Sequence, residues 1–267
     1  MTKSIQKLEA ALAVPLFERG SKGAEPTKFA HILYRHARVI EDELRYAMTE
    51  LSNVTEGLAG KISIGIGPAL GLSVFPSYLA ELQKRYPRTS FDVTTGVRDR
   101  LLPLVARGEI DIWVGSLHEI ESVPSLESVP FGEAEMTLFC RPDHPLRDRS
   151  SLGLADLSEV RWAFFREDDH GPKMLMDILA RNGVEQCEEG LRCDSLAQLF
   201  AAAGLSDLVV YAANTLAGEA KARGLVQLHL GQELWSFPVG LAFRSSVRSL
   251  TVVQEMIELM PAAGLRS

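Results

Sequence analysis

Residues 2–19 read TKSIQKLEAALAVPLFER, and this stretch sets the organisation that we expect for the rest of the chain. Apolar side chains recur in it at helical spacing, and Lys3 and Lys7 lie together on another face of the predicted helix. A short extended run follows at residues 14–17. Because so short a helix needs neighbours, we expect it to pack against residues that would precede Met1. The apolar positions are Ile5, Leu8, Leu12 and Leu16.

Length and composition indicate a soluble globular protein with two or more domains. The chain has 267 residues, which is more than one hydrophobic core usually comprises, and 46% of the residues are hydrophobic. No apolar run approaches the length of a membrane span, and the N-terminus lacks the basic and apolar regions of a signal peptide. We therefore expect a cytoplasmic protein.

The cysteines give no sign of a metal site. Cys140, Cys187 and Cys193 form no C-x-x-C pair, and no histidine lies near them at the spacing of zinc ligands. We interpret them as reduced, structural thiols, and we expect no metal and no cofactor.

The net charge of −7 is distributed unevenly. Residues 1–45 carry eight basic and six acidic side chains, whereas the remainder has a net charge of −9. Phosphate binding needs clustered cations, so only the N-terminal segment is suited to face nucleic acid. Residues 20–26 form a turn that would suit the tip of a β-wing, from which Arg19, Lys22 and Lys28 could contact phosphate. The alternative is a solvated surface loop.

A heptad-like seam follows the turn. Thr27 is a suitable N-cap, and apolar residues then recur in steps of four and three. This predicts a helix of about 28 residues, about 42 Å long, ended by Gly57 and Gly60. So narrow a stripe favours pairing with the same helix of another copy. The alternative, a helix lying on its own domain, is disfavoured because its other faces are strongly polar. The seam consists of Leu33, Ala37, Ile40, Leu44, Ala47, Leu51 and Val54.

From Lys61 onward, predicted strands and helices alternate, which indicates parallel sheets covered by helices. The last strand and helix do not fit the second α/β set, so we expect them to return to the first. Two lobes would then be joined by crossing strands near Met136 and Val239. The predicted strands are residues 62–66, 90–94, 110–114, 126–129, 135–141, 161–165, 189–192, 208–211, 226–229 and 238–243. The predicted helices are residues 72–86, 101–107, 172–182, 196–203, 215–223 and 250–260.

The stretch SIQKLEAALAVPLFER, residues 4–19, resembles the end of the helix-turn-helix and the wing of LysR-type transcriptional regulators. The resemblance implies a partial winged helix-turn-helix, a dimerising linker helix and a two-lobed α/β effector domain similar to periplasmic solute-binding proteins. The expected domains are residues 1–26, the linker 27–58 and the effector domain 59–267, with lobe I at 60–134 and 240–267 and lobe II at 137–238. The resemblance continues through KISIG at 61–65, FP at 75–76, RYP at 85–87, GEID at 108–111, PDHPL at 142–146, DSL at 194–196 and AAAG at 201–204.

Three features depart from the family pattern. The family places two further helices and the start of the recognition helix before the position of Thr2, so we expect a truncated product or an internal start. The common wing ending, Leu-Thr before a small residue and glycine, is replaced by residues 26–29. The Gly-x-Gly-x-x-x-Leu-Pro run near the second-lobe cleft is replaced by residues 204–211, so ligand contacts there do not transfer directly.

Ligands of parallel α/β sheets bind beyond the carboxyl ends of the strands, near helix N-termini, and the resemblance implies an effector in the same cleft. Arg98 could clamp a carboxylate, which favours an anionic ligand slightly, although pairing with Asp99 is an equal alternative. Ser195 could equally be only a helix cap. The candidates are Pro68, Ala69, Leu70, Val97, Arg98, Ser116, Arg166, Ser195 and Ala212, with Gly96, Asp168, Asp194 and Asn214 in the same loops.

Enzymatic and nucleotide-binding functions are disfavoured. The glycines at 65, 67 and 71 match a dinucleotide fingerprint poorly, and no G-x-S-x-G elbow occurs. Asp168, Asp169 and His170 have no second cluster to complete a metal site. Cys187 and Cys193 fall after the helix that follows the reactive loop of peroxide-sensing family members, so they are expected to pack structurally.

We therefore expect a dimeric or tetrameric transcriptional regulator that binds a small-molecule effector and double-stranded DNA. The alternative is an N-terminally truncated effector-binding protein, or a dominant-negative partner, that does not bind DNA. A periplasmic solute receptor would share the lobes but would not explain the seam. The expected DNA-binding residues are Thr2, Lys3, Lys7, Arg19, Lys22 and Lys28.

Overall fold

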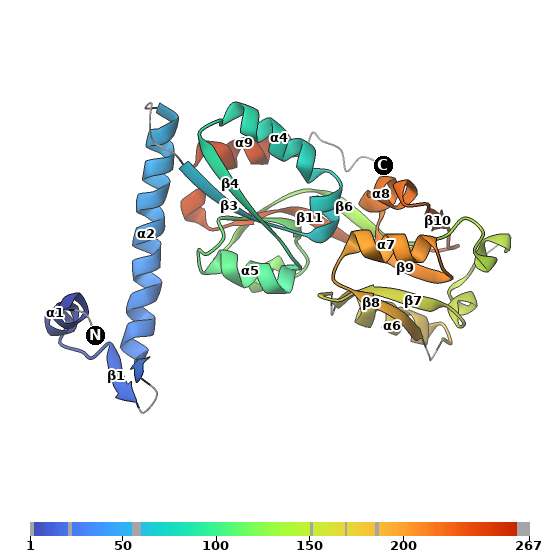
Figure 1. The fold of residues 1–267 in the computed structure, drawn as a ribbon, viewed down its shortest axis with the longest axis horizontal. Coiled ribbons are helices and arrows are strands. Elements are labelled where there is room, and N and C mark those ends of the chain that lie inside the picture. The colour runs from blue at the N-terminus through green and yellow to red at the C-terminus, as the bar shows by residue number, and fades with distance from the viewer. Residues whose placement is uncertain are drawn as a thin grey trace.

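The computed structural model describes residues 3–20, 23–54, 60–149, 152–168, 170–184 and 187–260. A small N-terminal unit lies at one end of the long helix α2 (Lys28–Val54), and the other end of α2 lies beside a two-lobed α/β body (Figure 1). This confirms the two-lobed α/β fold predicted from the alternating pattern. The helix-turn-helix part of that expectation remains a prediction.

The N-terminal unit consists of α1 (Lys3–Leu12) and an antiparallel hairpin of β1 (Phe17–Gly20) and β2 (Gly23–Pro26). The Glu9 carboxylate joins the two parts, because its Oε1 accepts hydrogen bonds from the backbone N–H groups of Leu16 and Phe17 at 2.7 and 3.1 Å. Leu16 is buried, whereas Leu8 and Leu12 of α1 are exposed. Residues 13–16 form a turn and bends, so of the extended run predicted at 14–17 only Phe17 belongs to a strand, the first of the predicted wing.

Helix α2 begins as the sequence indicates. Thr27 caps it, since its Oγ1 accepts a hydrogen bond from the N–H of Ala30 at 3.3 Å and donates one to the carbonyl of Pro15 at 2.8 Å. Gly57 and the other residues between Val54 and Gly60 lie outside the described residues. Gly60 already belongs to the first strand of lobe I and is not part of a linker.

The polar face of α2 packs on lobe I and its apolar seam does not. Asp42 and Tyr46 are 2% and 3% exposed, whereas Ile40 and Leu44 are 71% and 64% exposed. Leu44 lies two residues from both buried side chains, about 200° around the helix, so the two faces are nearly opposite. The helix therefore does lie on its own domain, but through residues that the seam does not contain.

A buried carboxylate fixes this contact. Asp111 is fully buried, and Arg45 reaches both of its oxygens at 2.7 and 3.0 Å. Tyr46 donates to Oδ1 at 2.8 Å, and the backbone N–H and hydroxyl of Ser63 donate to Oδ2 at 2.7 and 2.8 Å. Arg244 completes the network with bonds to Asp42 at 2.9 Å and to Tyr46 at 2.6 Å. Because donors surround the carboxylate, its charge is satisfied without water.

Gly108 is needed for the same contact. Its φ is +79°, a backbone conformation that residues other than glycine rarely adopt. An added Cβ would lie 2.0 Å from Nη1 of Arg244 and 2.3 Å from Oδ2 of Asp42. Its carbonyl accepts a hydrogen bond from Nη2 of Arg38 at 3.0 Å. The GEID sequence at 108–111 therefore supplies both the close approach and the buried acceptor for α2.

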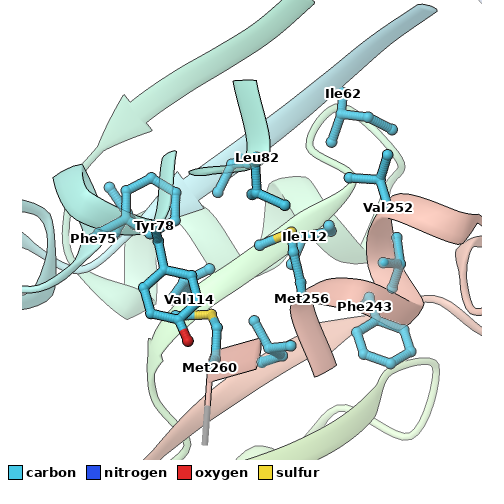
Figure 2. Packing of buried hydrophobic residues seen from close by; sticks show 14 of the residues in the cluster. Ile62, Phe75, Tyr78, Leu82, Ile112, Val114, Phe243, Val252, Met256 and Met260 are labelled. Carbon is cyan, nitrogen blue, oxygen red and sulfur yellow. The ribbon is translucent and has the colours of Figure 1, made fainter. Parts of the chain in front are cut away.

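Lobe I contains β3 (Gly60–Ile66), β4 (Thr89–Thr95) and β5 (Ile112–Ser116), which are parallel, and β11 (Ser236–Phe243), which is antiparallel to β5. Helices α4 (Phe75–Arg85) and α9 (Thr251–Leu259) cover one face and α5 (Arg98–Ala106) the other (Figure 1). Figure 2 shows how residues of α4 and α9 pack over the strands. The remaining elements are α3 (Pro68–Leu72) and the 3-10 turns η1 (Ile120–Ser122) and η5 (Ser245–Val247).

Lobe II contains β7 (Arg161–Phe165), β8 (Glu188–Cys193), β9 (Leu208–Ala213) and β10 (Val226–Leu228). Trp162 and Phe164 pack toward α6 (His170–Arg181), and Ala163 between them packs toward α7 (Leu196–Gly204). This alternation along β7 is what a sheet covered on both faces requires. The remaining elements are α8 (Ala217–Ala222) and the 3-10 turns η2 (Pro145–Asp148), η3 (Leu154–Leu157) and η4 (Asn214–Leu216).

The strand β6 (Glu127–Cys140) joins the lobes. Its first half pairs with β11 and its second half with β9 and β10. Two separate strands were predicted here, and that prediction was wrong because β6 continues through Pro130. The register against β11 shifts between Val239 and Gly240, which accommodates the interruption. The helix predicted at 72–86 is observed as α4, which begins at Phe75 with Pro76 in its first turn, and the separate short helix α3 (Pro68–Leu72) precedes it.

We expect Asp111→Asn to lower the free energy of unfolding by about 3 kcal/mol at neutral pH, because it removes the charge that Arg45 pairs with in a buried site. Urea denaturation measures this. The matched control is Asp92→Asn, whose carboxylate pairs with Lys61 at 2.9 Å but is 54% exposed; its effect should stay within about 0.5 kcal/mol.

The pH dependence of the difference in unfolding free energy between wild type and Asp111→Asn is a second test. Burial acts to raise the pKa of Asp111, but the hydrogen bonds from Arg45, Ser63 and Tyr46 outweigh it, and the pKa is lowered. A lowered pKa contributes stability above the unfolded pKa of about 3.9, and that stability is lost as the pH falls through the folded pKa. The difference between wild type and Asp111→Asn should therefore shrink below about pH 4. A difference that grows on acidification would contradict this account.

Candidate functional site

A cavity of about 300 Å³ lies between the two lobes. Lobe I contributes the loops after β3, β4 and β5, and lobe II contributes the loop after β7 and the ends of α6 and α7. The crossing strands β6 and β11 form its floor. The cavity is thus at the carboxyl ends of the parallel strands, where small molecules bind in open α/β sheets.

Seven of the nine predicted effector-binding residues line this cavity: Pro68, Ala69, Leu70, Val97, Arg98, Ser116 and Ala212. The other two lie elsewhere. Arg166 donates from its backbone N–H to the carbonyl of Cys193 at 2.7 Å and from Nη2 to that of Arg192 at 3.1 Å. Ser195 accepts a hydrogen bond from the N–H of Gln198 at 3.4 Å, which is the capping role that the sequence left open. Of the other loop positions considered, Asp168 lines the cavity.

Aromatic side chains form much of the wall, and sequence reasoning missed most of them. Tyr211 packs against Trp235 with ring centroids 6.1 Å apart, and Trp113, Phe165 and Phe237 also line the cavity. Trp113 and Tyr211 lie within strands, and Trp235 directly precedes β11, so the rule about residues after strands does not select them. The sequence offered one indication of this wall, the aromatic residues Trp235 and Phe237 directly before the crossing strand predicted at 238–243.

Asp168 and Tyr211 form the central polar pair of lobe II. The Tyr211 hydroxyl donates to Oδ2 of Asp168 at 2.6 Å, and the N–H of Gly171 donates to Oδ1 at 2.8 Å. Burial, together with the neighbouring Asp168 carboxylate, raises the pKa of Tyr211 far above its usual range. Tyr211 therefore remains a neutral hydrogen-bond donor at any physiological pH.

Arg98 is held by groups of lobe I. Its Nη1 donates to the carbonyl of His118, its Nε lies 3.4 Å from Oδ1 of Asp99, and its Nη2 lies 4.0 Å from Oε2 of Glu119. The predicted alternative, pairing with Asp99, is therefore present. The guanidinium is 20% exposed, and its Nε atom is shielded from solvent.

Three contacts near the cavity link lobe II to lobe I or to the crossing strand β6. The rings of His118, from lobe I, and His170, from lobe II, lie with centroids 5.1 Å apart. Arg100 of α5 forms an ion pair with Glu167, which follows β7. The carboxamide oxygen of Asn214 accepts a hydrogen bond from the backbone N–H of Glu135 at 3.2 Å. The lobes thus meet through polar groups that a change of lobe angle would separate.

The part of the chain that the structure describes contains no cluster of three or more histidine, cysteine or acidic residues placed to hold a metal ion, and Asp169 lies outside that part. Within the same residues no helix is both long and apolar enough to cross a membrane. The three cysteines are free, and burial raises the pKa of the Cys140 thiol to about 11. Burial also raises the pKa of Cys187, which makes both thiols poor nucleophiles.

The predicted DNA-contacting residues are only partly described. Lys3, Lys7 and Lys28 are exposed, and the ammonium of Lys28 lies over the ring of Phe29, 5.1 Å from its centroid. Thr2 and Lys22 lie outside the described residues, and Arg19 lies in β1 with a side chain that is not described.

Comparisons with known proteins agree with the fold. The family model described as LysR substrate binding domain matches residues 55–264. A probable RuBisCO transcriptional regulator of Cyanidioschyzon merolae is 29% identical over 182 residues, 68% of this chain and 60% of the relative. The SDS degradation transcriptional activation protein of a Pseudomonas strain is 28% identical over 246 residues, 88% of this chain and 77% of the relative. Both relatives are named as regulators of transcription, which supports a non-enzymatic family.

The solved structure of full-length CbnR complexed with its target DNA is similar with a TM-score of 0.61 and 16% identity, covering 98% of this chain and 88% of that chain. At this identity the likeness concerns the fold. The chain spans less than two thirds of the length of the Cyanidioschyzon relative, since the match covers 60% of it.

Gly171 lets α6 approach the pair of Asp168 and Tyr211, and its replacement tests that packing. A Cβ there would lie 2.3 Å from Oδ2 of Asp168 and 2.7 Å from Oη of Tyr211, so we expect Gly171→Ala to lower the free energy of unfolding by about 1–3 kcal/mol. Gly218→Ala in α8 is the matched control, because nothing lies within 4 Å of its added Cβ. That variant should gain about 0.5–1 kcal/mol from helix propensity. Equal effects in urea denaturation would contradict the close packing of α6.

Proposed function

The chain belongs to the LysR family of transcriptional regulators, and on that premise we propose that it binds a small-molecule effector between its lobes and controls transcription as a DNA-bound dimer or tetramer. We also propose that it acts in the cytoplasm, and that the divisions suggested by the sequence, residues 1–26, 27–58 and 59–267, are its functional units. The two opposite faces of α2 are the observation that carries the proposal.

The exposed seam supports self-association. Ile40, Leu44 and Leu51 are 71%, 64% and 54% exposed, and with Ala37 and Ala47 they form an apolar stripe along α2. Isolated exposed apolar residues are ordinary, but a stripe repeating in steps of three and four is typical of a helix that pairs with another helix. Leu33 is half-buried, and the side chain of Val54 lies outside the described residues.

The buried face of α2 supports coupling to the effector. Because Asp111 and Arg244 fix α2 to lobe I, the helix moves with that lobe. An effector that pulls the lobes together would then change the angle between lobe II and the paired helices. The ion pair of Arg100 with Glu167 and the contact of His118 with His170 are the groups that such a movement would alter.

The charge distribution supports DNA contact at the end of α2 far from the lobes. The exposed Lys3 and Lys7 of α1 and Lys28 at the start of α2 lie in the part of the chain that carries a net positive charge. In the similar CbnR structure the full-length protein is complexed with its target DNA. We propose that pairing of two chains presents two such basic ends to neighbouring segments of one duplex.

We expect Leu44→Glu to convert the dimer to monomer in analytical ultracentrifugation, because pairing would place two carboxylates in an apolar seam. Val39→Glu is the matched control. Val39 is 50% exposed and lies about 100° around the helix from Ile40, off the seam, so its variant should remain dimeric. Dimers that survive Leu44→Glu would refute pairing through α2.

We expect Lys7→Ala to reduce the slope of log Kd against log salt concentration for a bound duplex by about 1 per chain, because a lysine on phosphate releases about one counterion. The duplex is first selected from a random pool by retention on the full chain. Lys84→Ala is the matched control, since Lys84 is 76% exposed but lies on α4 of the effector domain. If dimers form and no duplex is retained, the chain is instead an effector-binding partner that does not bind DNA.

A further inference from the structure

We propose that the effector is a small molecule with an apolar body of about one or two rings and a cationic group, such as a protonated amine, with Asp168 as its counter-ion. This inference rests on the proposed function, because it names the chemical class of the ligand in the same cavity. It reverses the slight preference for an anion that Arg98 suggests in the sequence.

The charges around the cavity favour a cation. One arginine, Arg98, and four carboxylates line it. The carboxylates belong to Asp99, Glu119, Glu167 and Asp168, and both lobes contribute to the set. Glu167 pairs with Arg100, and Asp99 and Glu119 lie beside Arg98 with side chains that are 67% and 64% exposed. Of the four carboxylates, Asp168 is therefore the one outside the ion pairs of the described residues, and an anion would meet its uncompensated charge. A cation would meet the complementary field.

Arg98 is a poor receptor for a carboxylate ligand in this arrangement. Asp99 and Glu119 already lie at 3.4 and 4.0 Å from its nitrogens, and a third donor group is bonded to the His118 carbonyl. Its Nε is shielded from solvent and has no hydrogen-bond partner among the described residues, so a ligand carboxylate would have to approach through Nη1 and Nη2. There it would compete with the His118 carbonyl on Nη1 and be repelled by the Glu119 carboxylate beside Nη2.

Asp168 is in the opposite situation. Its two oxygens accept hydrogen bonds from neutral donors, Tyr211 at 2.6 Å and the Gly171 N–H at 2.8 Å. None of the ion pairs formed among the described residues includes Asp168. The positive charge of Arg192 acts to lower the pKa of Tyr211, so Arg192 is a cation near this pair. Among the described residues its guanidinium forms an ion pair with Glu189, at 2.6 and 2.9 Å, and not with Asp168. Asp168 is therefore a carboxylate that is oriented by two hydrogen bonds and that pairs with no cationic side chain in the part of the chain that the structure describes.

The aromatic walls complete a site of this kind. Tyr211 and Trp235 pack against each other, and Phe165 and Phe237 line the same space. The faces of such rings attract cations, and proteins recognise organic ammonium groups with aromatic side chains of this kind. Asp168 would add the counter-charge. The cavity volume of about 300 Å³ suits a ligand of the size of a substituted single or fused ring.

The test compares ligands that share a body and differ in charge. Two trios serve: 2-phenylethylamine, 2-phenylethanol and 3-phenylpropionate, and tryptamine, tryptophol and indole-3-propionate. Thermal shift and calorimetry with the full chain should give an amine that binds about tenfold or more tighter than the carboxylate of its trio, corresponding to about 1.4 kcal/mol.

Three variants separate the counter-ion role from a structural one. Asp168→Asn keeps the acceptor for Gly171, and it should weaken amine binding about tenfold while leaving alcohol binding unchanged. Asp143→Asn, with a carboxylate that is 82% exposed and outside the cavity, is the matched control and should change neither. Arg98→Gln should not weaken amine binding.

The opposite results would overturn the proposal. A carboxylate that binds more tightly than its amine, and loses affinity in Arg98→Gln, would mean that the effector is anionic, and the proposed function would remain. Equal loss of all ligands in Asp168→Asn would assign Asp168 a structural role only. Failure of both amines to bind would also refute the proposal, and the sedimentation and duplex measurements would then decide the proposed function separately.

Discussion

The buried carboxylate of Asp111 is the constraint on which the arrangement of the molecule depends. It accepts hydrogen bonds from two residues of α2 and from the backbone and side chain of Ser63 in β3, so one group joins the long helix to the first strand of lobe I. A buried carboxylate without these donors would be strongly unfavourable. Helix α2 therefore cannot separate from lobe I as long as Asp111 is ionised and excluded from water. The geometry of this contact sets which face of α2 points outward.

That geometry divides α2 into two functions that do not compete. Polar residues make the contact within the chain, and apolar residues remain available on the other side. The division is unusual for a helix on a globular domain, whose apolar face is normally the buried one. It follows that removing the seam and removing the network should have separable effects, one on association and the other on stability.

The cavity depends on a different part of the fold, the crossing strands. Because β6 pairs with β11 in lobe I and with β9 in lobe II, the two sheets are held at a common edge and the loops at their carboxyl ends face each other. Gly240 permits this crossing, since a Cβ there would lie 2.4 Å from the carbonyl oxygen of Val129. The aromatic residues near the crossing then become the floor and wall of the cavity, and the carboxylates of the two lobes come to share one space.

By itself the sequence determined the order and type of most elements, the seam of α2, its N-cap and the family, because periodicity, capping and short motifs depend on neighbours along the chain. It also located seven cavity residues, since the ends of parallel strands meet at one edge. Only the tertiary structure decided the continuity of β6, the partners of Asp111 and the aromatic wall. These depend on residues brought together from distant positions, such as Tyr46 with Asp111 and Asp168 with Tyr211. The proposed preference for a cationic ligand depends on packing in the same way, because packing and not local sequence sets which groups lie beside Arg98 and which donors reach Asp168.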